Sequence, residues 1–578
     1  MKRKIPVKSD IVKKRASLLV VFLILCSFAI FGRLAVLQIA NGAYYKGLAD
    51  DQYEFYQKLT PNRGEIKITD KDAQGGYLVA TNIRKPLVYA VPKVITDPNA
   101  VAEKLGAVLG IDPKDILPKL TDQSRSYVAI KKQITSEQQN AVKALKLKGI
   151  SFDYEYTRFY PENNLLSQVV GFVGYKGDKK LGLYGLERYF EGELKGKEGS
   201  IRQDKDVSGA WIFGAKREMT PAEDGDTLLL TIDRAIQFKA NTVIKDAVEK
   251  HEADSGSIVI EDPKTGAILA MANYPDFNPN EYNKVENPAV YQNGAAQGAY
   301  EPGSVFKAFT MAAAVNEGKV SPDSTYIDTG KVVVDDYTIM NSDKKAHGLR
   351  TMTQVLEDSL NTGVIYAKEQ VGNPTFLKYV KAFGFGKTTE IEIPEAKGNL
   401  DNLIKGNIKV NYDTASFGQG LSVTTLQLAQ GYSALANKGV MMKPYIVQSR
   451  IGSDGKAHTT DPIALTRVVT EKTASAVSAM LVSVIENGHG KKAGVPGYYI
   501  AGKTGTAQVP KSNGKGYEEN NNIGSFAGFG PVEDPKFVMI VRVNHPRTVS
   551  FAETTAAPAF GEMAQFLLNY YNIAPTRK

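Results

Sequence analysis

The sequence predicts an α+β protein with one N-terminal transmembrane helix, a mixed α/β region and a large C-terminal domain built on an antiparallel sheet flanked by helices. Three observations support this prediction. An apolar run lies close to the N-terminus, and short strands alternate with amphipathic helices up to about residue 225. Beyond residue 225, strands come first and last and helices dominate the middle, so the first and last strands are expected to meet in one sheet.

The positive charge of the chain is concentrated at its N-terminus. The formal net charge is +9, but residues 1–17 carry seven basic side chains against the single acid Asp10. A basic tail beside an apolar segment indicates membrane topology rather than nucleic-acid binding. We therefore expect no nucleic-acid partner.

The apolar run Ala16–Gly32 has the composition of a membrane span. Its 17 residues are at the short end of what crosses a bilayer, but Arg33 can snorkel to the interface. We therefore expect a cytoplasmic tail over residues 1–17 and a single-pass anchor over residues 18–40. The rest of the chain would lie on the outer face of the cell membrane.

Two alternatives to an uncleaved anchor are weaker. A signal peptide could be cleaved at Ala40-Asn41-Gly42, but this site lies beyond Arg33. Lipid attachment at Cys26 needs a small residue before it, where the chain has Leu25. Because Cys26 is the only cysteine, no intrachain disulfide is expected, and the scattered histidines show no metal-ligand spacing.

Residues 41–225 contain no candidate catalytic set. The stretches GGYLVAT and PLVYAVP predict two strands, and Asn99–Ile111 and Ser136–Ile150 predict amphipathic helices. This region is expected to be a structural spacer or docking domain. The polar stretch REMTPAEDGDT indicates its boundary with a second domain over residues 226–578.

The C-terminal domain begins with a predicted strand that runs into a long helix, LLLTIDRAIQFKANTVIKDAVEKH. Two apolar strands then surround an Asp-Pro-Lys-Thr-Gly turn. Three further strands are predicted in GYYIAGKTGTAQV, SFAGFGPV and PKFVMIVRVN, and a helix in TTAAPAFGEMAQFLLNYYN closes the chain.

The pattern Ser-x-x-Lys occurs four times, starting at Ser304, Ser342, Ser453 and Ser512. Three copies lie in polar, turn-like stretches, whereas Ser304 and Lys307 open an apolar segment that is expected to be a buried helix. Residues three apart share a helix face, and burial lowers the pKa of a lysine that has no carboxylate partner. A neutral Lys307 could therefore act as general base for Ser304.

Two further patterns contain hydroxyl groups suited to the same chemistry. Lys-Thr-Gly occurs in the turn at Lys264, where it needs no function, and again in Lys503-Thr504-Gly505-Thr506 after an apolar strand. There a lysine and two hydroxyls could bind a carboxylate, and Gly505 would allow close backbone approach. Ser-x-Asn occurs once, at Ser359-Leu360-Asn361, where a helix cap is the structural alternative.

Together the three motifs match a known set. They occur in the order Ser-x-x-Lys, Ser-x-Asn, Lys-Thr-Gly-Thr, which is typical of serine acyl transfer on D-alanyl peptides and β-lactams. The chain resembles the class B penicillin-binding proteins, the membrane-anchored peptidoglycan D,D-transpeptidases. The resemblance extends over NRGEI, RFYP, GLYGLERYF, DPKTGAILAMANYPDFNPN, YEPGSVFKAFT and FGQGLSVTTLQLAQGYSALANKGVMMKP. EPGS before the serine is closer to the division-type (FtsI-like) branch.

The resemblance implies a serine β-lactamase-like transpeptidase domain preceded by an elongated pedestal of the dimerisation type. It implies that Ser304 attacks the penultimate D-alanine of a stem peptide, that Lys307 accepts its proton and that D-alanine leaves. Ser359 would relay the proton to the leaving nitrogen. Asn361 would hold Lys307 and the substrate amide.

For the last motif, the resemblance implies that Lys503, Thr504 and Thr506 bind the terminal carboxylate, with Gly505 between them. The N–H groups of Ser304 and Thr506 would form the oxyanion hole. Peptidoglycan stem peptides would be the substrates and β-lactams would acylate the same serine. A SEDS-type glycan polymerase and small membrane proteins would be partners, and no cofactor is implied.

Two other functions remain open at this point. A D,D-carboxypeptidase or β-lactamase-type hydrolase could use the same three motifs, although a class A β-lactamase needs a glutamate-activated water. A non-catalytic sensor of β-lactams would need a signalling output, for which the 17-residue tail is too short. The long region before the second domain favours the transpeptidase over both.

Overall fold

The computed structural model describes residues 9–41, 54–71, 76–177, 179–204, 217–511, 516–549 and 551–577. The chain divides into two compact units. One unit comprises Met1–Pro61 with Lys197–Glu223, and the other comprises Asn62–Gly196 with Asp224–Lys578.

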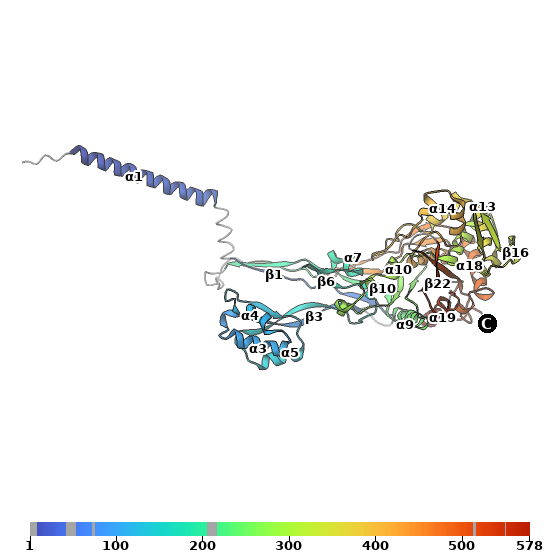
Figure 1. Cartoon of the computed structure of the whole chain (residues 1–578), viewed down its shortest axis with the longest axis horizontal. Helices are drawn as coiled ribbons and strands as arrows, with labels where there is room; N and C mark the ends of the chain where they lie inside the picture. Colours follow the sequence, from blue (N-terminus) through green and yellow to red (C-terminus); the bar gives the residue numbers. More distant parts are fainter. Residues whose placement is uncertain are drawn as a thin grey trace, which may run out of the picture. The chain divides into compact units, whose positions relative to one another are not determined.

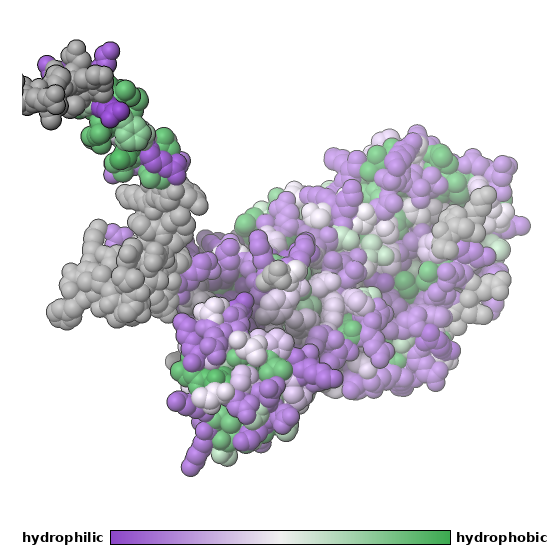
Figure 2. Space-filling view, turned by 60° about the vertical axis from the view of Figure 1, so that its left-hand side comes forward, coloured by the Kyte–Doolittle hydropathy of each residue, from purple (hydrophilic) through white to green (hydrophobic). Residues whose placement is uncertain are grey.

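The first unit contains the N-terminal helix and a small sheet. Helix α1 (Ser9–Ala35) continues into a π-helical turn (Val36–Ala40), and Lys13–Ile39 is long and apolar enough to cross a membrane. Figure 2 shows this helix mainly green along its length, whereas most other surface in that view is purple. The sheet has the antiparallel order β1-β8-β9, from Glu54–Leu59, Gly199–Asp204 and Arg217–Thr220.

The second unit contains a mixed sheet of the order β19-β18-β10-β2-β3-β4, with β5 also paired to β3. Strands β2 and β10 are parallel, and the other pairs are antiparallel. This sheet joins segments from both sides of residue 225, the predicted domain boundary. Its strands are Ile66–Thr69 (β2), Tyr77–Ala90 (β3), Val128–Lys131 (β4), Ile150–Phe159 (β5), Thr227–Asp233 (β10), Val447–Ile451 (β18) and Ala457–Thr459 (β19).

A small separate core forms where α3 (Pro98–Leu109), α4 (Pro113–Thr121) and α5 (Ser136–Ala144) pack beside β3, as Figure 1 shows. The predicted elements are confirmed here with two changes in their bounds. The expected helix over Ser136–Ile150 ends at Ala144, because Lys146 and Gly149 have positive φ values of 48° and 82° and turn the chain into β5. The two strands expected before it are one strand, β3, because β5 pairs with it continuously across Pro86.

The second unit also contains a five-stranded sheet with the order β12-β11-β23-β22-β21, and every neighbouring pair is antiparallel. The strands β11 and β12 lie on either side of the predicted Asp-Pro-Lys-Thr-Gly turn, and β21, β22 and β23 come from the C-terminal region. This confirms the prediction that the first and last strands of the domain meet in one sheet. Ile258 pairs with Val541 at this junction. The strands are Ser255–Glu261 (β11), Ile268–Tyr274 (β12), Ala501–Pro510 (β21), Tyr517–Gly530 (β22) and Phe537–Asn544 (β23).

Helices cover both faces of this sheet. Alternate strand residues such as Ile258 and Val541 join the core under α9 (Arg234–Lys250) and α19 (Ala556–Tyr570), whose labels lie beside each other in Figure 1. Residues of the opposite face, such as Val259, join the core that includes α17 (Thr425–Ala436). The predicted strand-to-helix segment and closing helix are therefore confirmed as β10–α9 and α19.

Between the early and late strands lie the helices and hairpins that carry two of the motifs. These are η5 (Gly303–Phe306), α11 (Lys307–Asn316), β13 (Thr325–Asp328), β14 (Lys331–Val334), β15 (Tyr337–Met340), β16 (Gly348–Thr351), α12 (Met352–Glu357), α13 (Asn361–Val371), α14 (Asn373–Ala382), α15 (Asp401–Ile404), α16 (Lys409–Ala415), β17 (Val440–Met442), β20 (Ala464–Arg467) and α18 (Glu471–Glu486). Strand β13 pairs with β16, and β14 with β15. Short elements elsewhere are η2 (Pro92–Val94), α6 (Ser167–Val170), β6 (Val173–Lys176), β7 (Lys179–Gly182), α7 (Gly185–Tyr189), α8 (Glu191–Leu194), η3 (Pro279–Lys284), η4 (Pro288–Tyr291), α10 (Gly294–Gln297) and η6 (Lys491–Ala493).

Candidate active site

Ser304 lies in the short 3₁₀ turn η5, which leads directly into helix α11. Gly303 precedes it with a φ of 60°, and its N–H donates a 3.0 Å hydrogen bond to the carbonyl of Gly418. A Cβ on Gly418 would lie 2.2 Å from the Gly303 carbonyl oxygen. Only glycine therefore fits at residue 418, and this backbone contact holds the turn that presents Ser304.

Lys307 is the first residue of α11 and is completely buried, as are the next seven residues. Its Nζ donates hydrogen bonds to the Ser359 carbonyl (2.5 Å), to Ser359 Oγ (3.3 Å) and to Asn361 Oδ1 (2.8 Å). Burial lowers the pKa of Lys307 well below its ordinary value, and the nearby charge of Lys503 lowers it further. A neutral amine in this position can accept a proton.

Ser359 connects α12 to α13 and does not cap either helix. The residue before α13 is Leu360, which makes no side-chain cap. Ser359 has a φ of 55°, a conformation that non-glycine residues seldom adopt, and this bend directs both its carbonyl and its hydroxyl toward Lys307. The helix-cap alternative for this motif is therefore wrong.

The third motif lies on the edge strand β21. Lys503 is fully buried and donates a 2.9 Å hydrogen bond to Ser359 Oγ, and burial lowers the pKa of Lys503 to about 7. A Cβ on Gly505 would lie 2.9 Å from the Pro302 carbonyl oxygen, so β21 approaches the Ser304 turn closely at this residue. Thr506 Oγ1 accepts the N–H of Ala552, which fixes the adjoining loop.

The three motifs meet at one cleft of about 800 Å³. Ser304, Ser359, Asn361, Thr504 and Thr506 line it, while Lys307 and Lys503 lie buried beneath. The structure therefore brings together the residues that the sequence singled out. Their individual roles are proposed below.

Several lining residues were missed by the sequence analysis. Apart from Ser342, which starts a competing motif, they come from residues 338–344 and His347, from Asp358, from Thr414, Phe417 and Gln419, and from Gln508, Asn522, His489, Phe551 and Glu553. No local pattern marks most of them, because they reach the cleft only through the packing of distant segments. Phe417 and Gln419 lie at the start of the block FGQGLSVTTLQLAQGYSALANKGVMMKP, which supports the resemblance to the family but predicted no role for these two residues.

The competing copies of the motifs lie elsewhere or lack a buried amine. Ser342 lines the same cleft, but both it and Lys345 are exposed. Lys456 forms a 2.8 Å ion pair with Asp454 in an exposed turn, and Lys264 pairs with Asp534. The fourth copy, at residues 512–515, lies outside the described residues.

Comparisons with known proteins give the same picture. The family model described as Penicillin binding protein transpeptidase domain matches residues 256–565, which is more than half of the chain. The model described as Penicillin-binding Protein dimerisation domain matches residues 58–230.

Similar proteins cover nearly the whole chain. Stage V sporulation protein D of Bacillus subtilis (strain 168) is 35% identical over 98% of this chain and 87% of its own. The probable peptidoglycan D,D-transpeptidase PbpC of Pseudomonas aeruginosa is 31% identical over 97% of this chain and 96% of its own. Penicillin-binding protein 3 from Mycobacterium tuberculosis, in complex with aztreonam, has a TM-score of 0.70 at 26% identity and covers 90% of this chain and 98% of that one.

The fold, the family models and the relatives define a penicillin-binding serine acyltransferase. The chain belongs to the class B penicillin-binding proteins, in their FtsI-like branch. It is a peptidoglycan D,D-transpeptidase that acts on the cell wall and binds β-lactams.

Proposed function

We propose that Ser304 is the nucleophile of this transpeptidase. Its Oγ attacks the carbonyl of the penultimate D-alanine of a stem peptide, so that an ester bond forms while the peptide bond to the terminal D-alanine breaks. The serine proton passes to Lys307 and finally to the nitrogen of the departing D-alanine. Burial supports this role for Lys307, because it favours the neutral amine.

The neighbouring motif residues would guide this proton and hold the substrate. Ser359 lies within hydrogen-bond reach of both Lys307 and Lys503, so its hydroxyl can relay a proton toward the leaving nitrogen. Asn361 holds Lys307 through its side-chain oxygen. Lys503 carries a positive charge below pH 7 that would attract the terminal carboxylate.

Thr504 and Thr506 complete the proposed carboxylate site, since both line the cleft. The backbone N–H groups of Ser304 and Thr506 would stabilise the oxyanion, for which one donor is typically worth about 100- to 1,000-fold in rate. Gly505 keeps these two backbone segments close together.

One observation carries the proposal. Two fully buried lysines from separate motifs, Lys307 and Lys503, converge on the hydroxyl of Ser359 at the floor of the cleft that Ser304 lines. Burying two lysine amines that contact no acid in the described part of the chain is unfavourable for folding. An arrangement of this kind is typical of a catalytic site.

The second half-reaction separates the transpeptidase from hydrolases that use the same motifs. In cross-linking, the amine of a neighbouring stem peptide attacks the acyl-enzyme; in a carboxypeptidase or β-lactamase, water does. We propose that an amine is the acceptor, on the basis of the relatives named as D,D-transpeptidases.

Topology and partners are part of the same proposal. The basic residues that precede the apolar run favour a cytoplasmic N-terminus, so the cleft would face the outside of the cell. By resemblance, a SEDS-type glycan polymerase and small membrane proteins would contact the N-terminal helix and the pedestal.

The FtsI-like branch favours synthesis at the division septum, whereas the Bacillus subtilis relative is named for sporulation. Imaging of a fluorescent fusion during growth and sporulation would separate these roles.

The test of the catalytic proposal is intact-mass spectrometry of a soluble piece, about residues 45–578, incubated with benzylpenicillin and then digested. A stable adduct on the peptide that carries Ser304 supports a penicillin-sensitive acyltransferase. Consumption of penicillin without an adduct would indicate a hydrolase. An adduct on a different serine would contradict the assignment of the nucleophile.

A further inference from the structure

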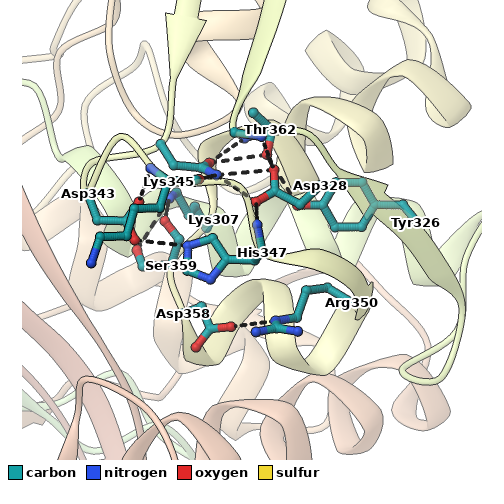
Figure 3. Close-up of polar contacts among 12 residues, drawn as sticks. Lys307, Tyr326, Asp328, Asp343, Lys345, His347, Arg350, Asp358, Ser359 and Thr362 are labelled. Carbon is teal, nitrogen blue, oxygen red and sulfur yellow. Dashed lines mark hydrogen bonds and ion pairs between the residues drawn. The ribbon is translucent and has the colours of Figure 1, made fainter.

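The carboxylate of Asp328 lies at the centre of a buried polar cluster next to the cleft. Asp328 ends strand β13 and is 2% exposed. It accepts hydrogen bonds from the Thr362 hydroxyl (2.7 Å), from the N–H groups of Gly330 (3.0 Å) and His347 (2.9 Å), and from Asn341 Nδ2 (2.9 and 3.1 Å). Figure 3 shows Thr362 and His347 in contact with Asp328 from different segments of the chain.

Of these donors, Thr362 is the sequence neighbour of Asn361 itself, and Asn341 is the sequence neighbour of Met340, whose carbonyl holds Asn361. Thr362 follows Asn361 at the start of α13, and Asn341 follows Met340 at the end of β15. Asn361 Nδ2 donates a 2.9 Å hydrogen bond to the Met340 carbonyl. The carboxylate therefore fixes both Asn361 and the carbonyl to which it is bonded.

Asn341 is also hydrogen-bonded directly to Thr362. Its Oδ1 accepts the Thr362 N–H at 3.2 Å and lies 3.1 Å from the Thr362 hydroxyl, whose single proton goes to Asp328, while its Nδ2 faces Asp328. The end of β15 and the start of α13 are thus locked together around one carboxylate. A change at Asp328 would release both segments.

The Met340 carbonyl determines which way round the Asn361 amide lies. A carbonyl can only accept a hydrogen bond, so the nitrogen of the Asn361 amide must face Met340 and its oxygen must face Lys307. With the amide reversed, its NH₂ group would face the Lys307 amine and could no longer accept the hydrogen bond that the amine donates. The position of Lys307 Nζ thus depends on the position of Met340.

We propose that Asp328 is a positioning residue for acylation, which acts through Asn341 and Thr362 to set the Asn361 amide and, through it, the amine of Lys307. This inference rests on the proposed roles of Lys307 and Asn361. It extends the site to a residue that does not line the cleft and that no local motif marks.

Only a carboxylate can make these contacts. Every partner of Asp328 is a donor, and the hydrogen bonds overcome the effect of burial to hold the pKa of Asp328 below its ordinary value. In Asp328→Asn, the new NH₂ group would face at least one N–H or NH₂ donor. This unfavourable contact between two donors would be relieved by movement of the loop around Asn341 or of the start of α13.

The experiment measures the binding constant and the first-order acylation rate constant of the soluble piece for a fluorescent penicillin. For Asp328→Asn we expect the rate constant to fall by about 10- to 100-fold, because small misplacements of catalytic groups carry penalties of this size, with little change in the binding constant. The matched control is Asp336→Asn, the same change at an exposed residue in the turn of the neighbouring hairpin, which should acylate like the wild type.

A second pair of variants avoids dependence on the folding of Asp328→Asn. Thr362→Ser keeps the hydroxyl that Asp328 accepts and should retain the wild-type rate constant, whereas Thr362→Val removes it and should slow acylation. Equal acylation rate constants in Thr362→Ser and Thr362→Val, or in folded Asp328→Asn and the wild type, would overturn the inference. A loss confined to the binding constant would overturn it as well.

The proposed function fails in a different way, through absence of an adduct on Ser304 in the wild type. The positioning inference then has a readout of its own, the crystal structures of Thr362→Ser and Thr362→Val. We expect the contact of Asn361 Nδ2 with the Met340 carbonyl to be kept in Thr362→Ser and lost in Thr362→Val. An unchanged contact in Thr362→Val would overturn the inference without reference to acylation.

Discussion

Lys503 donates a 2.9 Å hydrogen bond to the hydroxyl of Ser359, a residue 144 positions earlier in the chain. The amine of Lys307 lies 3.3 Å from the same hydroxyl. Because both amines are buried and neither has a carboxylate partner among these contacts, charge on one disfavours charge on the other. The shared hydroxyl is therefore flanked by the Lys307 amine, whose pKa is held well below its ordinary value, and by the Lys503 amine, whose pKa is lowered to about 7.

The pH dependence of acylation is the first prediction. The rate constant should rise with pH as Lys307 loses its proton, at a pH well below the ordinary pKa of lysine. Binding of a penicillin carboxylate should weaken as pH rises through about 7, because Lys503 then loses its charge. The ratio of the acylation rate constant to the dissociation constant should be a bell-shaped function of pH. Stopped-flow fluorescence between pH 5 and pH 9 separates its rising and falling limbs. A falling limb that appears only in the rate constant would contradict the assignment to Lys503.

The second prediction concerns the nucleophile. Ser304→Ala should abolish labelling by fluorescent penicillin on a denaturing gel, because no other hydroxyl of the cleft is expected to carry the acyl group. Ser342→Ala is the matched control, since Ser342 starts another Ser-x-x-Lys pattern and lines the same cleft. Label that survives in Ser304→Ala and disappears in Ser342→Ala would show that the wrong serine was chosen.

The third prediction tests Lys307 as the base. Lys307→Met removes the amine but keeps much of the side-chain volume, so the protein should stay folded and its melting temperature should not fall. The acylation rate constant should drop by about 100- to 10,000-fold, the usual contribution of a general base. Lys345→Met, at the exposed lysine of the neighbouring pattern, should acylate normally. The assignment is wrong if these two variants exchange behaviour.

The fourth prediction concerns Glu261, a fully buried residue at the end of β11. Burial raises its pKa from 4.5 to about 8, and the nearby Ser433 hydroxyl offsets only part of this effect. Between pH 4.5 and 8 the folded state holds a proton that the unfolded state has lost. The free energy of unfolding therefore falls as pH rises through this window.

Glu261→Gln should remove this loss of stability. Its melting temperature should exceed that of the wild type at pH 8, and the two should be similar near pH 5, as measured by calorimetry. Glu286→Gln, at an exposed position, should show no such difference. Equal melting temperatures of Glu261→Gln and the wild type at pH 8 would mean that the carboxylate is stabilised in some other way.

The fifth prediction concerns the backbone contact behind Ser304. Gly418→Ala would place a Cβ 2.2 Å from the Gly303 carbonyl oxygen, so either segment must move and acylation should slow together with a loss of stability. Gly455→Ala is the control, because Gly455 also has a positive φ (77°) but open space around it. Its cost should be limited to backbone strain of about 1 kcal/mol. Normal acylation in folded Gly418→Ala would mean that the Ser304 turn tolerates displacement.

The sequence was most informative where a motif carries its own chemistry. Ser304 and Lys307 were separated from three competing patterns by the apolar residues around them, and burial of α11 agrees with that choice. The sequence was least informative about where helices end and which predicted strands are continuous. Nothing local marks the end of α5 at Ala144 or joins two predicted strands into β3, since these outcomes depend on turn conformation and on pairing with β5.

Asp328 shows the same limit at the candidate site. It lies 33 residues before Asn361 in the sequence, in a short strand with no recognisable pattern, and its importance follows only from four donor groups that the fold brings to it. The lining residues from 338–344 and His347 were missed for the same reason. Contacts of this kind join segments that are distant in sequence, so no short stretch of the sequence predicts them.

By itself, the sequence determined the N-terminal helix that is long and apolar enough to cross a membrane, the family, the antiparallel sheet and the eight residues of the three motifs. Each of these follows from local composition or from an ordered set of motifs that few proteins share. The tertiary structure alone decided that Ser359 bridges two buried lysines, that glycine is required at residue 418, and that a carboxylate supports Asn361 through its neighbours. These features depend on distances of about 3 Å between segments that are distant in sequence, and such distances are set only when the core is packed.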